Sequence, residues 1–146
     1  MTTSLLMQII EHKMILVVAC AIKKNDKILL SQRPKGKHLE GFWEFPGGKV
    51  KSKETPEEAL RRELKEELNI SVNLFDLKPL TFASHTYEDF HLLMPLYLCS
   101  KWNGAITPME KQELTWIEPK KIKNLTIPPA DIPLVKTLIR ELEMGL

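Results

Sequence analysis

The sequence predicts a single domain of the α/β or α+β class, in which a mixed β-sheet lies between helices. Its periodic segments follow the order strands, helix, strands, helix, and such an order produces this layered arrangement. A continuous apolar run at 14–22 (MILVVACAI) is typical of a buried strand. One helix with clear signals at both ends is predicted over 55–69, and a second, amphipathic helix over 131–145.

The first elements form a predicted hairpin and a long loop. The polar residues 23–27 (KKNDK) are a turn, and ILLSQR continues as the second strand. The segment RPKGKHLEGFWEFPGG is rich in glycine, proline and aromatic residues, with a short strand expected at Trp43–Phe45. We predict a loose leader at residues 1–13 and one domain over 14–146.

The helix over 55–69 is predicted from its capping residues. Thr55 is a suitable N-cap, Pro56 suits the first helical position, and Glu58 completes a T-x-x-E capping box. Asn69 stands where a left-handed residue ends a helix, a conformation that asparagine tolerates better than other non-glycine residues.

The remaining elements follow the same logic. Two or three strands are expected within 71–87 and 91–102, with the turn at Tyr87-Glu88-Asp89. Another strand is expected at 114–119, a short helix at 120–123, and Pro128-Pro129 precede the last helix.

Composition limits the classes of partner. A net charge of +2 is too small to indicate nucleic-acid binding by itself, and the longest apolar run is about half of what a bilayer requires. Cys20 and Cys99 lie in apolar runs and are interpreted as buried free thiols of a reducing compartment. We therefore expect a cytoplasmic protein, a monomer or weak dimer, with no stable nucleic-acid partner and no membrane association.

A patch of carboxylates is predicted at the edge of the apolar stripe of the helix over 55–69. With Glu63 at 0° on a helical wheel, Glu67 lies at about 40° and Glu66 at about −60°. Leu60, Leu64 and Leu68 lie at about 60°, 100° and 140° and form the stripe that faces the core. A solvated acidic face is the usual interpretation of such glutamates, and a magnesium site is the functional alternative.

The context of these glutamates resembles a known motif. From Gly48 the sequence runs G-x5-E-x7-R-E-L-x-E-E-x-N-I, which resembles the Nudix box, G-x5-E-x7-R-E-U-x-E-E-x-G-U, with U a bulky aliphatic residue. Asn69 alone departs from it. SQRPKGKHLEGFWEFPGG, YEDFHL, the glutamate of MEKQELTW and PPADIP resemble the MutT branch of this family. The resemblance implies the Nudix fold and a nucleoside triphosphate pyrophosphohydrolase acting on oxidised dGTP.

The resemblance also implies a metal site and a catalytic set. Mg²⁺, with Mn²⁺ as an alternative, would be held by Glu63, Glu67 and the carbonyl of Gly47, with Glu66 as a further ligand. Either Glu63 or Glu110 would be the general base. Arg62 would orient a glutamate through a charge-assisted bond, with Glu54 beside it.

A nucleoside triphosphate is the expected partner, and the resemblance places its contacts before the box and near the last helix. These residues are Arg33, His38, Glu44, Phe45, Pro46, Gly47, Asp89 and Asp131. Asp131 is also predicted as the N-cap of the last helix. In the MutT branch an asparagine at the matching position hydrogen-bonds the purine. An ionised Asp131 only accepts, which suits the N7–H of 8-oxoguanine, and Asp89 would add to this.

Three functions remain open from the sequence. The first is a MutT-like hydrolase of oxidised nucleoside triphosphates that sanitises the nucleotide pool. The second is a Nudix enzyme for another substrate, such as CTP or its methylated forms, ADP-ribose or a dinucleoside polyphosphate. The third is a Nudix fold that only binds nucleotides, which the presence of every carboxylate of the box disfavours.

Overall fold

The computed structural model describes residues 13–145, so all of the predicted leader except Lys13 lies outside the described residues. The elements in chain order are β1 (Lys13–Lys24), β2 (Lys27–Gln32), β3 (Trp43–Glu44), β4 (Gly47–Lys49), α2 (Pro56–Leu68), η1 (Leu74–Asp76), β5 (Lys78–Thr86), β6 (Phe90–Cys99), β7 (Leu114–Ile117), η2 (Pro119–Asn124) and α3 (Asp131–Glu143). The predicted hairpin, the short third strand and both helices are confirmed. The short helix predicted at 120–123 is a 3₁₀ helix.

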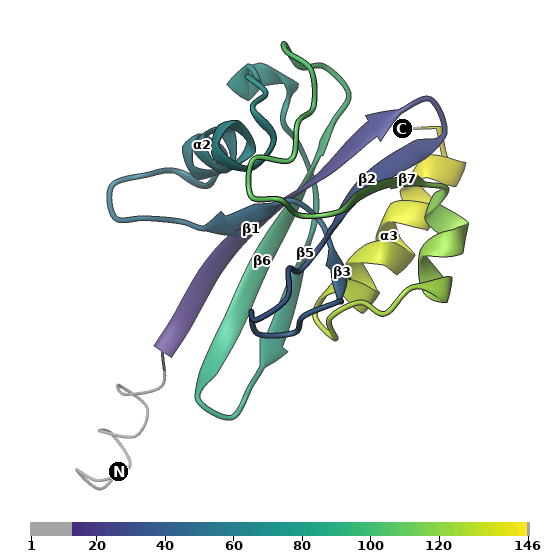
Figure 1. Ribbon diagram of the computed structural model, residues 1–146. Coiled ribbons are helices and arrows are strands. Elements are labelled where there is room, and N and C mark those ends of the chain that lie inside the picture. Colours follow the sequence, from purple (N-terminus) through teal and green to yellow (C-terminus); the bar gives the residue numbers. More distant parts are fainter. Residues whose placement is uncertain (1–12, 146) are drawn as a thin grey trace, which may run out of the picture.

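A mixed sheet forms the centre of the molecule (Figure 1). Its main path runs β3-β2-β1-β6-β5, with β4 paired to β1 and β7 to β2. β1 and β6 are parallel, and the other pairs are antiparallel. β1 pairs with β4 through Val17, Val18 and Ala19 but with β2 only at Lys23 and Lys24, so the sheet divides along this strand. The short strand β4, which carries Gly47 and Gly48, lies at this division.

Alternation along β1 sends side chains to two hydrophobic cores. Val18, Cys20 and Ile22 pack with the leucines of α2, while Ala19 and Ala21 pack with α3. Helices therefore cover both faces of the sheet, as Figure 1 shows for α2 and α3. This confirms the predicted arrangement of a mixed sheet between helices.

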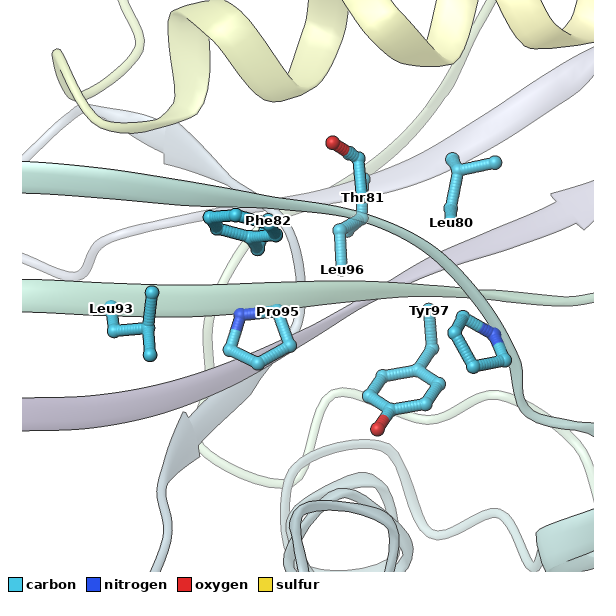
Figure 2. A pocket seen from close by; sticks show the side chains of 8 residues that line it. Leu80, Thr81, Phe82, Leu93, Pro95, Leu96 and Tyr97 are labelled. Atoms are coloured by element: carbon cyan, nitrogen blue, oxygen red, sulfur yellow. The ribbon is translucent and has the colours of Figure 1, made fainter.

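Strands β5 and β6 also present an apolar surface (Figure 2). Phe82 of β5 is 64% exposed there, beside Leu93 and Pro95 of β6. None of the predicted site residues lines this surface. Within residues 13–145, no helix is both long enough and apolar enough to cross a membrane.

Candidate active site

Helix α2 is the scaffold of the site, and its ends are those predicted. The side chain of Thr55 accepts from the N–H of Glu58, and the carboxylate of Glu58 accepts from the N–H of Thr55, each at 3.1 Å. Asn69 ends the helix at φ 56° and ψ 33°, the left-handed conformation. Leu60, one of three stripe leucines with no exposed surface, anchors the helix on the sheet. These contacts fix which way the glutamates between them point.

Arg62 joins the acidic side chains on one side of α2. Its Nε and Nη2 donate to the two carboxylate oxygens of Glu54 at 2.7 and 2.9 Å. Nη1 donates to Glu63 at 2.8 Å and more weakly to Glu66 at 3.4 Å. Nη2 also reaches the carbonyl of Lys49 at 3.1 Å. The guanidinium lowers the pKa of Glu54 to about 2, which keeps this side of the network ionised.

Glu63 lies over the backbone of β4, while Glu66 lies in solvent. A Cβ atom at Gly48 would overlap the Glu63 carboxylate, and one at Gly47 would overlap the backbone of Val18. Glycine is therefore required at 47, where the obstacle is backbone, whereas a side chain at 48 would displace the Glu63 carboxylate. The side chain of Glu66 is 55% exposed.

Glu67 faces the other acidic groups of the site. Burial, a hydrogen bond with Glu63 and the charges of Glu63 and Glu110 raise the pKa of Glu67 well above its usual range. A hydrogen bond from the backbone of Gly47 opposes this rise. The carboxylates of Glu63, Glu67 and Glu110 thus lie near one another and near the backbone of Gly47, although these residues come from α2, β4 and the loop before β7.

The loop that carries Glu110 is bound to the end of α2. The N–H of Met109 donates to the carbonyl of Glu67 at 2.9 Å, and the N–H of Thr107 to that of Leu68 at 2.9 Å. Gln112, which sequence reasoning missed, donates from Nε2 to the Glu67 carbonyl at 3.0 Å and accepts from the N–H of Glu110 at 2.9 Å. A lone glutamine in a polar loop gives no signal of this role.

A pocket beside these carboxylates brings together predicted catalytic and substrate-binding residues. Its lining includes Arg33, Glu44, Gly47, Glu67 and Glu110. Arg33 donates to Glu44 at 3.3 Å and, from Nε, to the carbonyl of His38 at 2.9 Å. The side chain of His38 is exposed, so the observed contact of this residue is through its backbone. Two of the N–H donors of Arg33 are therefore used to hold the segment between β2 and β3 in place.

Asp131 is not the helix N-cap that the sequence predicted. Ala130 is the N-cap and makes no side-chain capping bond, while Asp131 is the first residue of α3 and only 6% exposed. Burial and the charge of Glu44 raise the pKa of Asp131 to about 7, against a hydrogen bond from the Phe45 backbone and the charge of Arg33. The Asp131 carboxyl does not cap the helix because it accepts a hydrogen bond from the backbone of Phe45, in the segment before β4.

Among the other residues predicted to contact the nucleotide, two are buried in the segment before β4 and one lies in an exposed turn. Phe45 and Pro46 are buried, and Phe45 belongs to the core that includes α3. Burial and the charge of Asp131 raise the pKa of Tyr87, which stacks on Phe90 with ring centroids 4.9 Å apart. Asp89 is exposed in the turn between β5 and β6. Within this turn, the charge of Asp131 therefore raises the pKa of Tyr87.

The donors of the site suit a hard divalent cation. Within the described part of the chain, no group of three or more His, Cys, Asp or Glu side chains is arranged so that it alone could hold a metal ion. Mg²⁺ does not require one, since it typically keeps several waters and shares substrate phosphates. The mutual repulsion of Glu63, Glu67 and Glu110 favours a bound cation, and the backbone of Gly47 lies within hydrogen-bonding distance of Glu67. The residues present therefore fit the ion.

A family model described as the NUDIX domain matches residues 17–137. The chain belongs to the Nudix family. It is therefore a Nudix hydrolase, an enzyme class that acts on pyrophosphate bonds and generally uses divalent metal ions. The assignment confirms the resemblance inferred from the box despite the departure at Asn69.

Relatives and solved structures agree with this family. The CTP pyrophosphohydrolase of Escherichia coli (strain K12) is 38% identical over 129 residues, which cover 87% of this chain and 93% of the relative. The 8-oxo-dGTP diphosphatase of Haemophilus influenzae is 36% identical, covering 88% of this chain and 95% of the relative. The solution structure of the E. coli ORF135 protein matches with a TM-score of 0.81 at 32% identity, covering 92% of this chain and 94% of that one.

Proposed function

We propose that this Nudix hydrolase is a Mg²⁺-dependent nucleoside triphosphate pyrophosphohydrolase of the MutT type. Its proposed substrates are oxidised nucleoside triphosphates such as 8-oxo-dGTP, which it cleaves to the monophosphate and pyrophosphate. This reaction removes damaged nucleotides from the pool and prevents replication errors. The free, buried Cys20 and Cys99 agree with a reducing cytoplasm as its location, and a monomer or weak dimer remains our expectation.

One observation carries the proposal. The carboxylate site of α2 and the buried carboxyl of Asp131 are linked through a single short segment, from Glu44 to Gly47. Glu44 and Gly47 line the pocket with Glu67 and Glu110, and the Phe45 backbone between them bonds to Asp131. The carboxylate site and the buried carboxyl that we propose as the base reader thus share one segment of four residues, an arrangement that suits a nucleotide.

The residues divide the work of hydrolysis. Glu63, Glu66, Glu67 and the Gly47 carbonyl would hold Mg²⁺, with Mn²⁺ as an alternative. When bound, the ion neutralises charge that develops on the phosphates and orients the triphosphate. Arg62 holds the Glu63 carboxylate through its 2.8 Å bond while its other donors are anchored on Glu54.

A carboxylate of the site takes a proton from the attacking water. Glu63 and Glu110 are the two candidates, and both lie close enough to Glu67 to raise its pKa. Comparing Glu63→Gln with Glu110→Gln tests the choice. Loss of the base should lower kcat and flatten the acid limb of the pH–rate profile, while loss of a ligand alone should mainly raise the Mg²⁺ concentration needed for activity.

The base and the sugar are proposed to lie toward α3. Asp131 is proposed to read the base edge, and Glu44, Phe45 and Pro46 are proposed to contact the nucleotide beside it; the bond from the Phe45 backbone to Asp131 and the charge of Glu44 near Asp131 support this. Arg33 is proposed to contact the nucleotide with the donors that Glu44 and the His38 carbonyl leave free. Contacts by the His38 side chain and by Asp89 remain part of the proposal, since both residues are exposed and free to meet a ligand.

A cytosine nucleotide is the second candidate substrate. The similar E. coli protein is named CTP pyrophosphohydrolase. Cytosine presents an amino donor beside a ring-nitrogen acceptor, and a protonated carboxyl pairs with both. The raised pKa of Asp131, about 7, makes that protonation state accessible at neutral pH.

A substrate panel tests the proposal. We would measure kcat/KM for 8-oxo-dGTP, dGTP, CTP, 5-methyl-dCTP, ADP-ribose and a dinucleoside polyphosphate with Mg²⁺, and separate pyrophosphate from phosphate release. The highest kcat/KM is expected for 8-oxo-dGTP, with pyrophosphate as the product. A preference for the cytosine nucleotides would select the second candidate, and binding without turnover of any compound would overturn both.

A further inference from the structure

The loop before β7 completes the C-terminal end of α2. The last carbonyls of an α-helix have no partner within the helix and need donors from elsewhere. Here the N–H groups of Thr107 and Met109 donate to the carbonyls of Leu68 and Glu67. The helix turn that carries the Glu67 carboxylate is thus held by the loop that carries Glu110.

Gln112 is the side chain that closes this connection. It is 8% exposed, and one amide makes two bonds: its nitrogen donates to the Glu67 carbonyl at 3.0 Å, and its oxygen accepts from the Glu110 N–H at 2.9 Å. Glu67 lies 45 positions before Gln112 in the chain, so the amide joins two distant segments. No shorter or apolar side chain makes both bonds from this position, because one group must both donate and accept.

We propose that Gln112 is a positioning residue that holds Glu110 in register with Glu67. It touches neither substrate nor metal in this role and acts through the backbone of both glutamates. The inference rests on the proposed function in one respect, since the relative placement of the carboxylates affects turnover only if they act on a metal-bound phosphate. Its structural part, the fixation of the Glu110 backbone by the Gln112 amide, stands without that function.

Replacing Gln112 with methionine keeps the volume and removes both bonds. The Glu67 carbonyl retains its bond from Met109, whereas the Glu110 N–H loses the partner described here. The expected result is a movement of the loop and not unfolding of α2. Because supporting residues of metal sites typically contribute a factor of about 10–100 to activity or metal affinity, we expect kcat/KM of Gln112→Met to fall by about that factor.

Thr107→Val is the matched control. It removes a hydroxyl bond in the same loop, from Thr107 to the Ala105 carbonyl at 2.9 Å, and leaves both bonds of Gln112 in place. We expect kcat/KM of this control to stay within about twofold of the wild type. If Gln112→Met folds poorly, Gln112→Asn keeps the amide but is one methylene too short for both bonds, and a smaller loss in the same direction is expected.

A double-mutant cycle separates positioning from general support of the fold. If Gln112 acts through Glu110, Gln112→Met should change kcat/KM by less than about twofold in a Glu110→Gln background, because the carboxylate that it positions is already gone. A merely structural residue would lower kcat/KM by the same factor in both backgrounds. Equal factors, or a wild-type value of kcat/KM in Gln112→Met, would overturn the proposal.

Two measurements without nucleotide distinguish a failure of this inference from a failure of the proposed function. Hydrogen exchange at the Glu110 amide should accelerate in Gln112→Met and not in Thr107→Val. The dissociation constant for Mn²⁺, followed by electron paramagnetic resonance, should rise in the first variant only, because the Glu110 charge beside the proposed ligand Glu67 attracts the cation and would move away with the loop. If the wild type cleaves no nucleotide, the proposed function fails while these results still decide the role of Gln112. Unchanged exchange and Mn²⁺ affinity in Gln112→Met would refute it.

Discussion

The buried carboxyl of Asp131 should make base discrimination depend on pH. Its pKa is raised from 3.8 to about 7, mainly by burial and next by Glu44, while the Phe45 backbone and Arg33 act in the opposite direction. Tyr87, from the turn between β5 and β6, is the other titratable group influenced by this charge. Near neutral pH the site therefore contains Asp131 in both protonation states.

The two states favour different purines. Above its pKa, Asp131 accepts from the N7–H of 8-oxoguanine but meets the lone pair of N7 in guanine. Below its pKa, the protonated carboxyl donates to that lone pair and the penalty on guanine disappears. An unpaired buried acceptor costs about 1–3 kcal/mol, or roughly one to two orders of magnitude in kcat/KM. We expect the ratio of kcat/KM for 8-oxo-dGTP over dGTP to rise by up to about tenfold between about pH 6 and pH 8, because the protonated fraction of Asp131 falls by about that factor over this range.

The assay measures both nucleotides in competition at each pH. A ratio is used because protonation of the metal ligands or the triphosphate changes both rates together. Asp131→Asn is the matched variant, since it is isosteric, does not titrate, and should give a ratio independent of pH. Glu88→Gln, at an exposed position of the turn between β5 and β6, should keep the wild-type slope. A flat wild-type ratio, or the same slope in Asp131→Asn, would refute the assignment of Asp131 as the base reader.

The same shift predicts a change in stability with a definite sign. The folded state holds a proton on Asp131 up to about pH 7, while the unfolded chain releases it near pH 3.8. The contribution is therefore complete below the unfolded pKa and is lost as pH rises through the folded one. The shift corresponds to roughly 4 kcal/mol at most. Relative to its value near pH 4, the unfolding free energy of the wild type should fall toward pH 8 more than that of Asp131→Asn, as urea denaturation would measure.

Three further predictions follow from α2. Chelation with EDTA should abolish turnover and added Mg²⁺ should restore it; turnover in excess EDTA would contradict the metal site. In the same way, Glu67→Gln should lower kcat by orders of magnitude without loss of fold, because a neutral amide is a poor Mg²⁺ ligand. Arg62→Lys should lower kcat/KM about 10–100-fold, since lysine cannot replace the paired bonds to Glu54; a normal rate would reduce Arg62 to a surface ion pair. Asn69→Gly should change the unfolding free energy by less than about 1 kcal/mol, because both residues tolerate the left-handed conformation; a larger loss would reveal a side-chain bond of Asn69.

Local features of the fold were predictable from the sequence because their causes are local. The capping box at Thr55 and the left-handed Asn69 depend on residues within one helix turn of each other, and both are confirmed. The pairing of Glu54 with Arg62 also follows from the spacing of one motif. The parallel pairing of β1 with β6 did not follow, because it joins segments separated by most of the domain.

The errors at Asp131 and the omission of Gln112 have one physical origin. Aspartate before a helix normally caps it, but contact with the Phe45 segment, far away in the chain, buries the side chain of Asp131 instead. Gln112 owes its role to the orphan carbonyl of Glu67, 45 residues earlier. In both cases a polar side chain satisfies a distant backbone group, and neither periodicity nor spacing records such a partner.

The three faces of α2 have separable tasks, so mutations on each should fail differently. Leu64 on the apolar face has no exposed surface, and its truncation should lower stability by about 2–5 kcal/mol. Arg62 on the second face is bonded to carboxylates on both sides, so its loss should misplace Glu63 while the helix remains folded. Glu67 on the third face lies among like charges without a cation of the protein bonded to it in the described contacts. Glu67→Gln removes a carboxyl whose ionisation the folded site opposes and the unfolded chain allows, so it should stabilise the metal-free protein at neutral pH while it stops the reaction. A residue whose loss improves the fold and abolishes turnover is maintained for its chemistry, and α2 holds such a residue one turn away from the leucines that keep it in place.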